Sequence, residues 1–162
     1  LLVHDAKLWA HLREASRLKQ LAETPAAIYA SDQDPSAVKI AQRTFQAAGL
    51  TIDIRLRQSD VLTLEAPAGE GVMLINPPYG VRLSRTEELD AFYPRLGDWL
   101  KQRFSGWRVY IFTGDLRVPK LIGLAPSKRI PLFNGSLECR LYEFLIVPGS
   151  MRKIAPPPKS HT

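Results

Sequence analysis

The sequence contains a single cysteine and no long apolar run. One thiol, Cys139, excludes an internal disulfide and is typical of proteins from a reducing compartment. No window reaches the roughly 20 apolar residues that a membrane-spanning helix requires, and the opening residues lack the basic and apolar segments of a secretory signal. The histidines are scattered without the spacing of metal ligands. We therefore expect a cytoplasmic protein with no membrane contact and no metal.

Basic residues outnumber acidic ones, but the excess is small over most of the chain. Lys and Arg total 22 against 16 acidic residues, and residues 151–162 contribute three of these bases and no acid. This Pro-rich end predicts a flexible basic tail over 151–162, after one domain over 1–150. The domain itself is mildly basic, which permits a phosphate-bearing partner but does not establish one.

The hydrophobic periodicity alternates between helices and strands. Helical spacing predicts three helices, over 5–21, 35–48 and 86–104. Strands are predicted over 26–30, 52–57, 71–75, 107–112, 129–133 and 137–147. The apolar run at 71–75 is typical of a buried parallel strand, and Pro94 predicts a kink or break in the last helix. This order predicts an α/β fold, mostly parallel, with an antiparallel C-terminal hairpin.

Local signals mark several boundaries of these elements. Asp34 is typical of a helix N-cap and Pro35 of a first helical residue, while Gly49 predicts the end of the same helix. The pair Asn134-Gly135 predicts a tight turn between the last two strands.

The segment Asn76-Pro77-Pro78-Tyr79 directly follows the predicted strand at 71–75. Ligands of open α/β sheets bind at the carboxyl ends of the strands, where this segment lies. The prolines stiffen it, and the side-chain oxygen of Asn76 and the carbonyl of Pro77 offer two acceptors to one planar amino group. Such acceptors would localise the lone pair of the amino nitrogen, and Tyr79 offers a ring on which a base or an amide can stack. A proline-rich loop with a stacked tyrosine is the alternative interpretation.

A strand followed by Asn-Pro-Pro-Tyr resembles the amino-methylating motif of class I S-adenosylmethionine-dependent methyltransferases, whose members act on DNA adenine, RNA guanine or protein glutamine. The resemblance implies S-adenosylmethionine as the cofactor and transfer of its sulfonium methyl group to an exocyclic amine, with the thioether as the leaving group. It also implies Asn76, Pro77 and Tyr79 as catalytic residues, with Asn76 beside the cofactor as well.

Polar residues after two other predicted strands match the cofactor site of this family. Asp32 matches the acid that binds the ribose hydroxyls, and Gln33 falls where a side chain packs against the adenine. Asp60 matches the position whose carboxylate holds the adenine amino group. The alternative interpretation makes Asp32 and Asp34 helix caps, which we prefer for Asp34, and makes Asp60 an ordinary loop residue.

The C-terminal hairpin narrows the resemblance. Residues 128–142 resemble the ending of the large-subunit rRNA guanine-N2 methyltransferases, whose members carry a THUMP RNA-binding domain. This implies 23S ribosomal RNA as the partner and guanine N2 as the methyl acceptor. It also implies Lys128, Arg129 and Arg140 as RNA-binding residues, although solvated strand ends explain these cations nearly as well.

The sequence departs from this family in one respect. The family's Gly-rich loop, Asp-Pro-x-Cys-Gly-Ser-Gly-Thr after a first strand, does not occur here. We therefore expect a Rossmann-like fold that lacks its first strand, with that strand and the THUMP domain in an upstream segment of the full-length protein. The alternatives are a DNA adenine-N6 methyltransferase, a protein glutamine methyltransferase and a non-catalytic RNA-binding remnant.

Overall fold

The computed structural model describes residues 5–21, 26–50, 54–77 and 86–148. The chain forms two compact units, Leu1–Val61 and Leu62–Thr162. The predicted tail over 151–162 lies outside the described residues.

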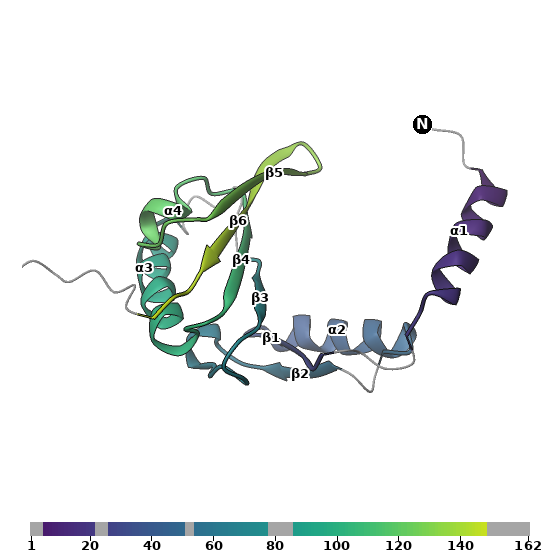
Figure 1. Ribbon diagram of the computed structural model, residues 1–162, viewed down its shortest axis with the longest axis horizontal. Helices are drawn as coiled ribbons and strands as arrows, with labels where there is room; N and C mark the ends of the chain where they lie inside the picture. The colour runs from purple at the N-terminus through teal and green to yellow at the C-terminus, as the bar shows by residue number, and fades with distance from the viewer. Residues whose placement is uncertain (1–4, 22–25, 51–53, 78–85, 149–162) are drawn as a thin grey trace, which may run out of the picture. The chain divides into compact units, whose positions relative to one another are not determined.

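The first unit contains a parallel pair of strands and two helices (Figure 1). Its elements are α1 (Ala6–Leu18), β1 (Ile28–Asp32), α2 (Pro35–Ala47) and β2 (Ile54–Gln58), followed by the short 3₁₀ turn η1 (Val61–Thr63) at the junction of the units. The register of the strand pair runs from Ile28 opposite Ile54 to Asp32 opposite Gln58. Both strands therefore end at the same edge of the sheet.

The helix ends of this unit follow from their capping residues. The Asp34 side chain accepts a hydrogen bond from the Ser36 amide at 2.8 Å, and Pro35 is the first residue of α2. Gly49 lies just beyond α2 with φ at +71°, a conformation that favours glycine. These three predictions are confirmed. The first predicted helix is shorter than expected, because α1 ends at Leu18.

The second unit is built on a four-stranded sheet in the order β3-β4-β6-β5. Strands β3 and β4 are parallel, whereas β6 is antiparallel to both β4 and β5. Its elements are β3 (Val72–Ile75), α3 (Thr86–Arg103), β4 (Arg108–Thr113), α4 (Val118–Leu121), β5 (Lys128–Asn134) and β6 (Leu137–Leu145). Gly135 turns the hairpin with φ at +62°, as Asn134-Gly135 predicts. The α/β fold with parallel strands and an antiparallel C-terminal hairpin is confirmed.

The core of the second unit lies on the face of the sheet that α3 and α4 cover (Figure 1). Alternate residues of β4 point to this face and are fully buried, as are most apolar residues of the facing side of α3. The largest fully buried side chains are Tyr93, Leu96, Leu100, Phe104, Ile111, Ile122, Phe144 and Ile146. Cys139 is also buried, as expected for a packed thiol.

Two predictions about buried segments differ from the structure. Pro94 does not break α3, which continues through it, and the alternative of a kink stays a prediction; Tyr93 and Leu96, both fully buried, hold the helix against the sheet on either side of the proline. Strand β3 is not buried on both faces, because Val72 is 68% exposed and Leu74 71% exposed. In the described residues β3 is an edge strand that pairs with β4 on one side, and α3 covers one face of the sheet. No described helix is long and apolar enough to cross a membrane.

Candidate functional site

The predicted catalytic segment begins at the carboxyl end of β3. The pairing of β3 with β4 ends at Ile75 opposite Ile111, so Asn76 and Pro77 lie directly beyond the ladder. Asn76 is exposed and Pro77 is buried. The side-chain amide of Asn76 is available to a ligand, while packing of the next residue, Pro77, fixes the backbone beside it. Tyr79 lies outside the described residues, so its predicted stacking role stays a prediction.

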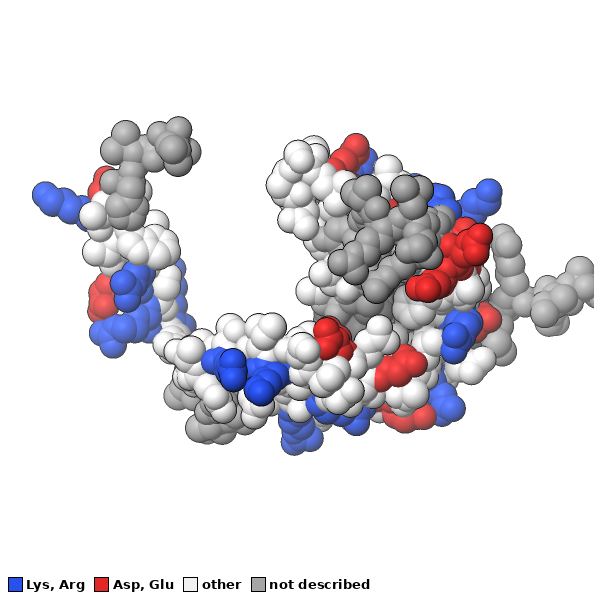
Figure 2. Space-filling model, turned by 180° about the vertical axis from the view of Figure 1, so that it is seen from behind, with Lys and Arg blue, Asp and Glu red and all other residues white. Residues whose placement is uncertain are grey.

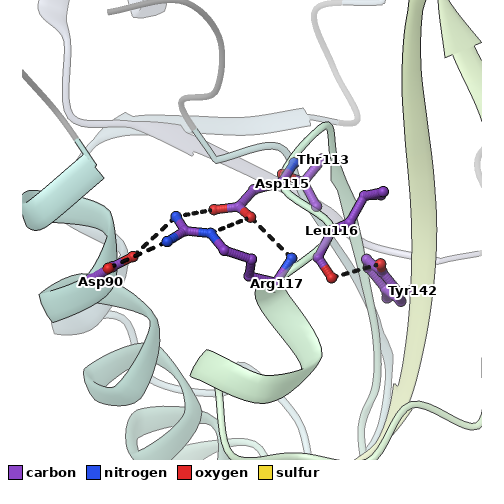
Figure 3. Close-up of polar contacts among 6 residues, drawn as sticks. All are labelled: Asp90, Thr113, Asp115, Leu116, Arg117 and Tyr142. Carbon is purple, nitrogen blue, oxygen red and sulfur yellow. Dashed lines mark hydrogen bonds and ion pairs between the residues drawn. The ribbon is translucent and has the colours of Figure 1, made fainter. Parts of the chain in front are cut away.

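A polar network occupies the end of the neighbouring strand β4 (Figure 3). The Asp115 carboxylate accepts hydrogen bonds from the Arg117 amide at 3.0 Å and from two guanidinium nitrogens at 3.0 and 2.8 Å. The Thr113 hydroxyl oxygen accepts a hydrogen bond from the Asp115 amide at 3.0 Å. A second ion pair joins Arg117 Nη2 to Asp90 Oδ1 of α3 at 3.0 Å. Arg117 therefore ties the turn after β4 to the first turns of α3.

The charges of this network support one another. Hydrogen bonds from Arg117 hold the pKa of Asp115 below its usual range, and the same contacts raise the pKa of the guanidinium. Burial raises the pKa of the nearby Tyr93 hydroxyl. These residues were not predicted, although Thr113-Gly114-Asp115 follows an apolar run as Asn76 does, and that signal could have found them.

The predicted cofactor-binding residues lie together in the first unit. Asp32 ends β1, and Asp60 follows β2 at the same edge. The Ser59 amide donates a hydrogen bond to the Asp32 carbonyl at 2.9 Å, and the Gln58 side chain donates one to the Gln33 carbonyl at 3.2 Å. These contacts hold the two strand ends side by side. The structure thus brings Asp32, Gln33 and Asp60 to one edge, whereas Asn76 and Pro77 belong to the second unit.

This edge fits the nucleoside part of the expected cofactor. Asp32 and Asp60 are both exposed, and carboxylates accept hydrogen bonds from ribose hydroxyls and from an amino group. One Asp32 oxygen, Oδ1, accepts a hydrogen bond from the Asp34 amide at 2.8 Å. This bond within the turn before α2 orients the carboxylate. Asp32 therefore does not cap α2, whose N-cap is Asp34, and its role in binding a cofactor stays a prediction.

The hairpin cations do not form one cluster. Residues directly opposite in an antiparallel pair share a face, which places Lys128 with Glu143 on one face and Arg129 and Arg140 on the other. Arg140 is engaged locally, because it forms an ion pair with Glu138 and donates to the Cys139 carbonyl at 3.0 Å. On the face of the second unit that Figure 2 shows, basic and acidic side chains are interspersed.

A buried carboxylate explains the position of Lys128. Glu143 is 3% exposed and accepts hydrogen bonds from the Tyr110 hydroxyl and, at 2.8 Å, from the Ser127 hydroxyl. These donors hold the pKa of Glu143 below its usual range. Lys128 Nζ lies 3.6 Å from the same carboxylate. The lysine therefore has a structural partner, and sequence analysis missed this acid because nothing local distinguishes it.

Comparisons with known proteins agree with the sequence and the fold. Residues 3–143 match the family model described as RMKL-like, methyltransferase domain. The ribosomal RNA large subunit methyltransferase K/L of Syntrophotalea carbinolica is 38% identical over 150 residues, which cover 88% of this chain and 21% of that protein. The chain spans 21–36% of the length of this and another curated relative, so it corresponds to part of a larger protein in each case.

Solved structures give the same fold. SMU.472, assigned as a methyltransferase and complexed with SAH, superposes with a TM-score of 0.75 at 27% identity, over 89% of this chain and 38% of that one. A protein of Listeria monocytogenes described as a predicted N6-adenine-specific DNA methylase superposes with a TM-score of 0.71 at 27% identity, over 86% of this chain and 36% of that one. Because the family model matches most of the chain, the chain belongs to the RMKL-like methyltransferase domain family.

Proposed function

We propose that this chain is the part of an S-adenosylmethionine-dependent methyltransferase that presents an exocyclic amine for methylation, and that the amine is guanine N2 of 23S ribosomal RNA in the cytoplasm. The observation that carries the proposal is the exposed Asn76 on buried Pro77, at the carboxyl end of β3 in a chain of a methyltransferase family. The relatives named as ribosomal RNA large subunit methyltransferases support the choice of substrate.

The chain's own residues act on the amine. The side-chain oxygen of Asn76 and the carbonyl of Pro77 each accept a hydrogen bond from one N–H of the amine. These two bonds fix the plane of the amino group and leave its lone pair free to attack the methyl group. When bound, S-adenosylmethionine supplies a methyl group on a sulfonium, which is already activated for displacement. The ring of Tyr79 holds the base by stacking. Because a paired guanine hides this amine, the base must be unpaired or flipped out.

The cofactor is held in this proposal by residues of the first unit. Asp32 accepts hydrogen bonds from the ribose hydroxyls, and Asp60 accepts one from the adenine amino group. Gln33 packs against the adenine. The sequence has no Gly-rich turn for the methionine end. We propose that an upstream segment of the full-length protein supplies this turn together with a strand. In the described residues β3 is an edge strand, whose unpaired backbone groups offer that strand a partner.

The experiment is methyl transfer from labelled cofactor to pools of ribosomal RNA, DNA and protein, with the chain joined to its upstream segment. We expect label in large-subunit RNA, at guanine N2 after nuclease digestion. Asn76→Ala should reduce turnover about 10²–10³-fold, as the loss of one transition-state hydrogen bond does, while cofactor binding changes little. Gln102→Ala, which removes an exposed amide from α3, is the matched control. An Asn76→Ala variant with more than a third of normal turnover would contradict the role of Asn76.

A DNA adenine-N6 methyltransferase is the second candidate, since the same two acceptors suit an adenine amino group. The similarity to the Listeria protein described as a DNA methylase favours it. Label in DNA with none in RNA would establish this alternative. No label in any pool would support the non-catalytic RNA-binding remnant.

A further inference from the structure

The hairpin of β5 and β6 extends beyond the carboxyl end of β3, where Asn76 lies. In the register across the sheet, Ile75 lies opposite Ile111, Ile111 opposite Tyr142, and Tyr142 opposite Arg129. Arg129 is therefore level with the end of β3, three strands away, or about 14 Å at the usual strand spacing. From there β5 continues outward for four more residues to Phe133.

One face of this projection combines a cation with an exposed aromatic ring. Arg129, Pro131 and Phe133 alternate onto the same face of β5, which we call the arginine face. Phe133 is 71% exposed near the turn. Arg129 is exposed, and within the described part of the chain it forms no ion pair. The two side chains start about 13 Å apart, at four residues of strand rise.

We propose that the arginine face binds an unpaired stretch of RNA beside the target base, with Phe133 stacking on one base and Arg129 contacting a phosphate. The inference rests on the proposed function, because it places this RNA next to a base held at Asn76. An exposed ring near a cation is the combination that binds single-stranded nucleic acid, since every base has a stacking face and every nucleotide a phosphate. Arg140 contributes less than Arg129, because Glu138 already neutralises it.

The opposite face of the hairpin has a different chemistry and provides the control. Ile130, Leu132 and Leu137 are 38–43% exposed there and include no aromatic ring. Leu132 is adjacent to Phe133 but points to the other side of β5. A change at Leu132 removes exposed apolar surface from the same strand, although less than a change at Phe133 does, without touching the arginine face.

The test is fluorescence anisotropy of a labelled single-stranded RNA oligonucleotide with the full chain, without cofactor. We expect Phe133→Ala to raise Kd about tenfold or more, as the loss of one stacked base does. Phe133→Trp should keep the affinity, since it keeps a ring, and Leu132→Ala should change Kd less than twofold. Arg129→Ala should weaken binding of all sequences equally and lower the slope of log Kd against log salt by about 1. Circular dichroism of each variant checks that the fold is kept.

Two results would overturn the proposal. Equal Kd values for Phe133→Ala and the unchanged chain would mean that this ring faces a protein partner or solvent. Equal losses for Phe133→Ala and Leu132→Ala would mean that the hairpin acts only through its stability. The outcome is separable from that of the proposed function: ring-dependent RNA binding without methyl transfer contradicts only the latter, and transfer without ring-dependent binding contradicts only the former.

Discussion

Gly97 of α3 lies in close contact with Ile122, the C-cap residue of α4. A Cβ atom at this residue would lie 2.0 Å from the carbonyl oxygen of Ile122, 3.0 Å from its carbonyl carbon and 3.1 Å from its side chain. The nearest obstacle is backbone, so no side-chain rotation can remove it. Gly97→Ala therefore requires that α3 and the end of α4 move apart.

Two opposing effects decide the size of this change. Within a helix, alanine is favoured over glycine by about 1 kcal/mol. Overpacking a filled core costs about 1–3 kcal/mol and occasionally more. A contact of 2.0 Å against a carbonyl oxygen belongs at the upper end of that range. We expect Gly97→Ala to lower the free energy of unfolding by about 1–2 kcal/mol net.

Urea unfolding followed by tryptophan fluorescence measures this directly, because Trp99 and Trp107 are both buried in the second unit. The third tryptophan, Trp9, is exposed in the first unit, and a Trp9→Phe background removes its signal. Gly69→Ala is the control, since a Cβ there has no atom within 4 Å. A Gly97→Ala chain as stable as the unchanged chain, or more stable, would refute the close packing of α3 on Ile122.

Two further predictions concern single side chains. Tyr110 and Ser127 lower the pKa of Glu143, so its contribution to stability is present above the unfolded pKa of about 4.3 and is lost as the pH falls through the lower folded value. Glu143→Gln should therefore flatten the loss of Tm between pH 6 and pH 3 (roughly the range around these values), and an unchanged slope would contradict it. Tyr79→Ala should raise the KM for RNA more than Tyr79→Phe does, because stacking needs the ring and not the hydroxyl. Equal defects in the two variants would assign the role to the hydroxyl.

Features set by neighbouring residues could be predicted from the sequence. The start of α2 follows from Asp34 and Pro35, whose side chain and ring act within the first turn. The hairpin follows from Asn134-Gly135, because the left-handed conformation of the turn favours glycine. The placement of Asn76 at a strand end follows from the apolar run before it.

Features set by contacts between distant segments could not be predicted. The exposure of Val72 and Leu74 depends on whether another element covers the face of the sheet opposite α3, and an apolar run carries no such information. The ion pair of Arg117 with Asp90 joins residues of different elements and exists because α3 packs beside the turn after β4. Continuity of α3 through Pro94 likewise depends on the sheet beneath it, whose contacts outweigh the local cost of the proline.

The same distinction applies to the residues that bear on function. Asp32 is the last residue of β1, and Asp60 and Asn76 follow β2 and β3, so the ends of predicted strands together with the family resemblance selected these residues. The hairpin cations follow an antiparallel pair, in which the face of each residue depends on register. Arg129 lies opposite Tyr142 and is exposed, whereas Lys128 lies opposite Glu143 and neutralises that buried carboxylate. Three residues of like charge in the sequence thus have three different surroundings in the fold.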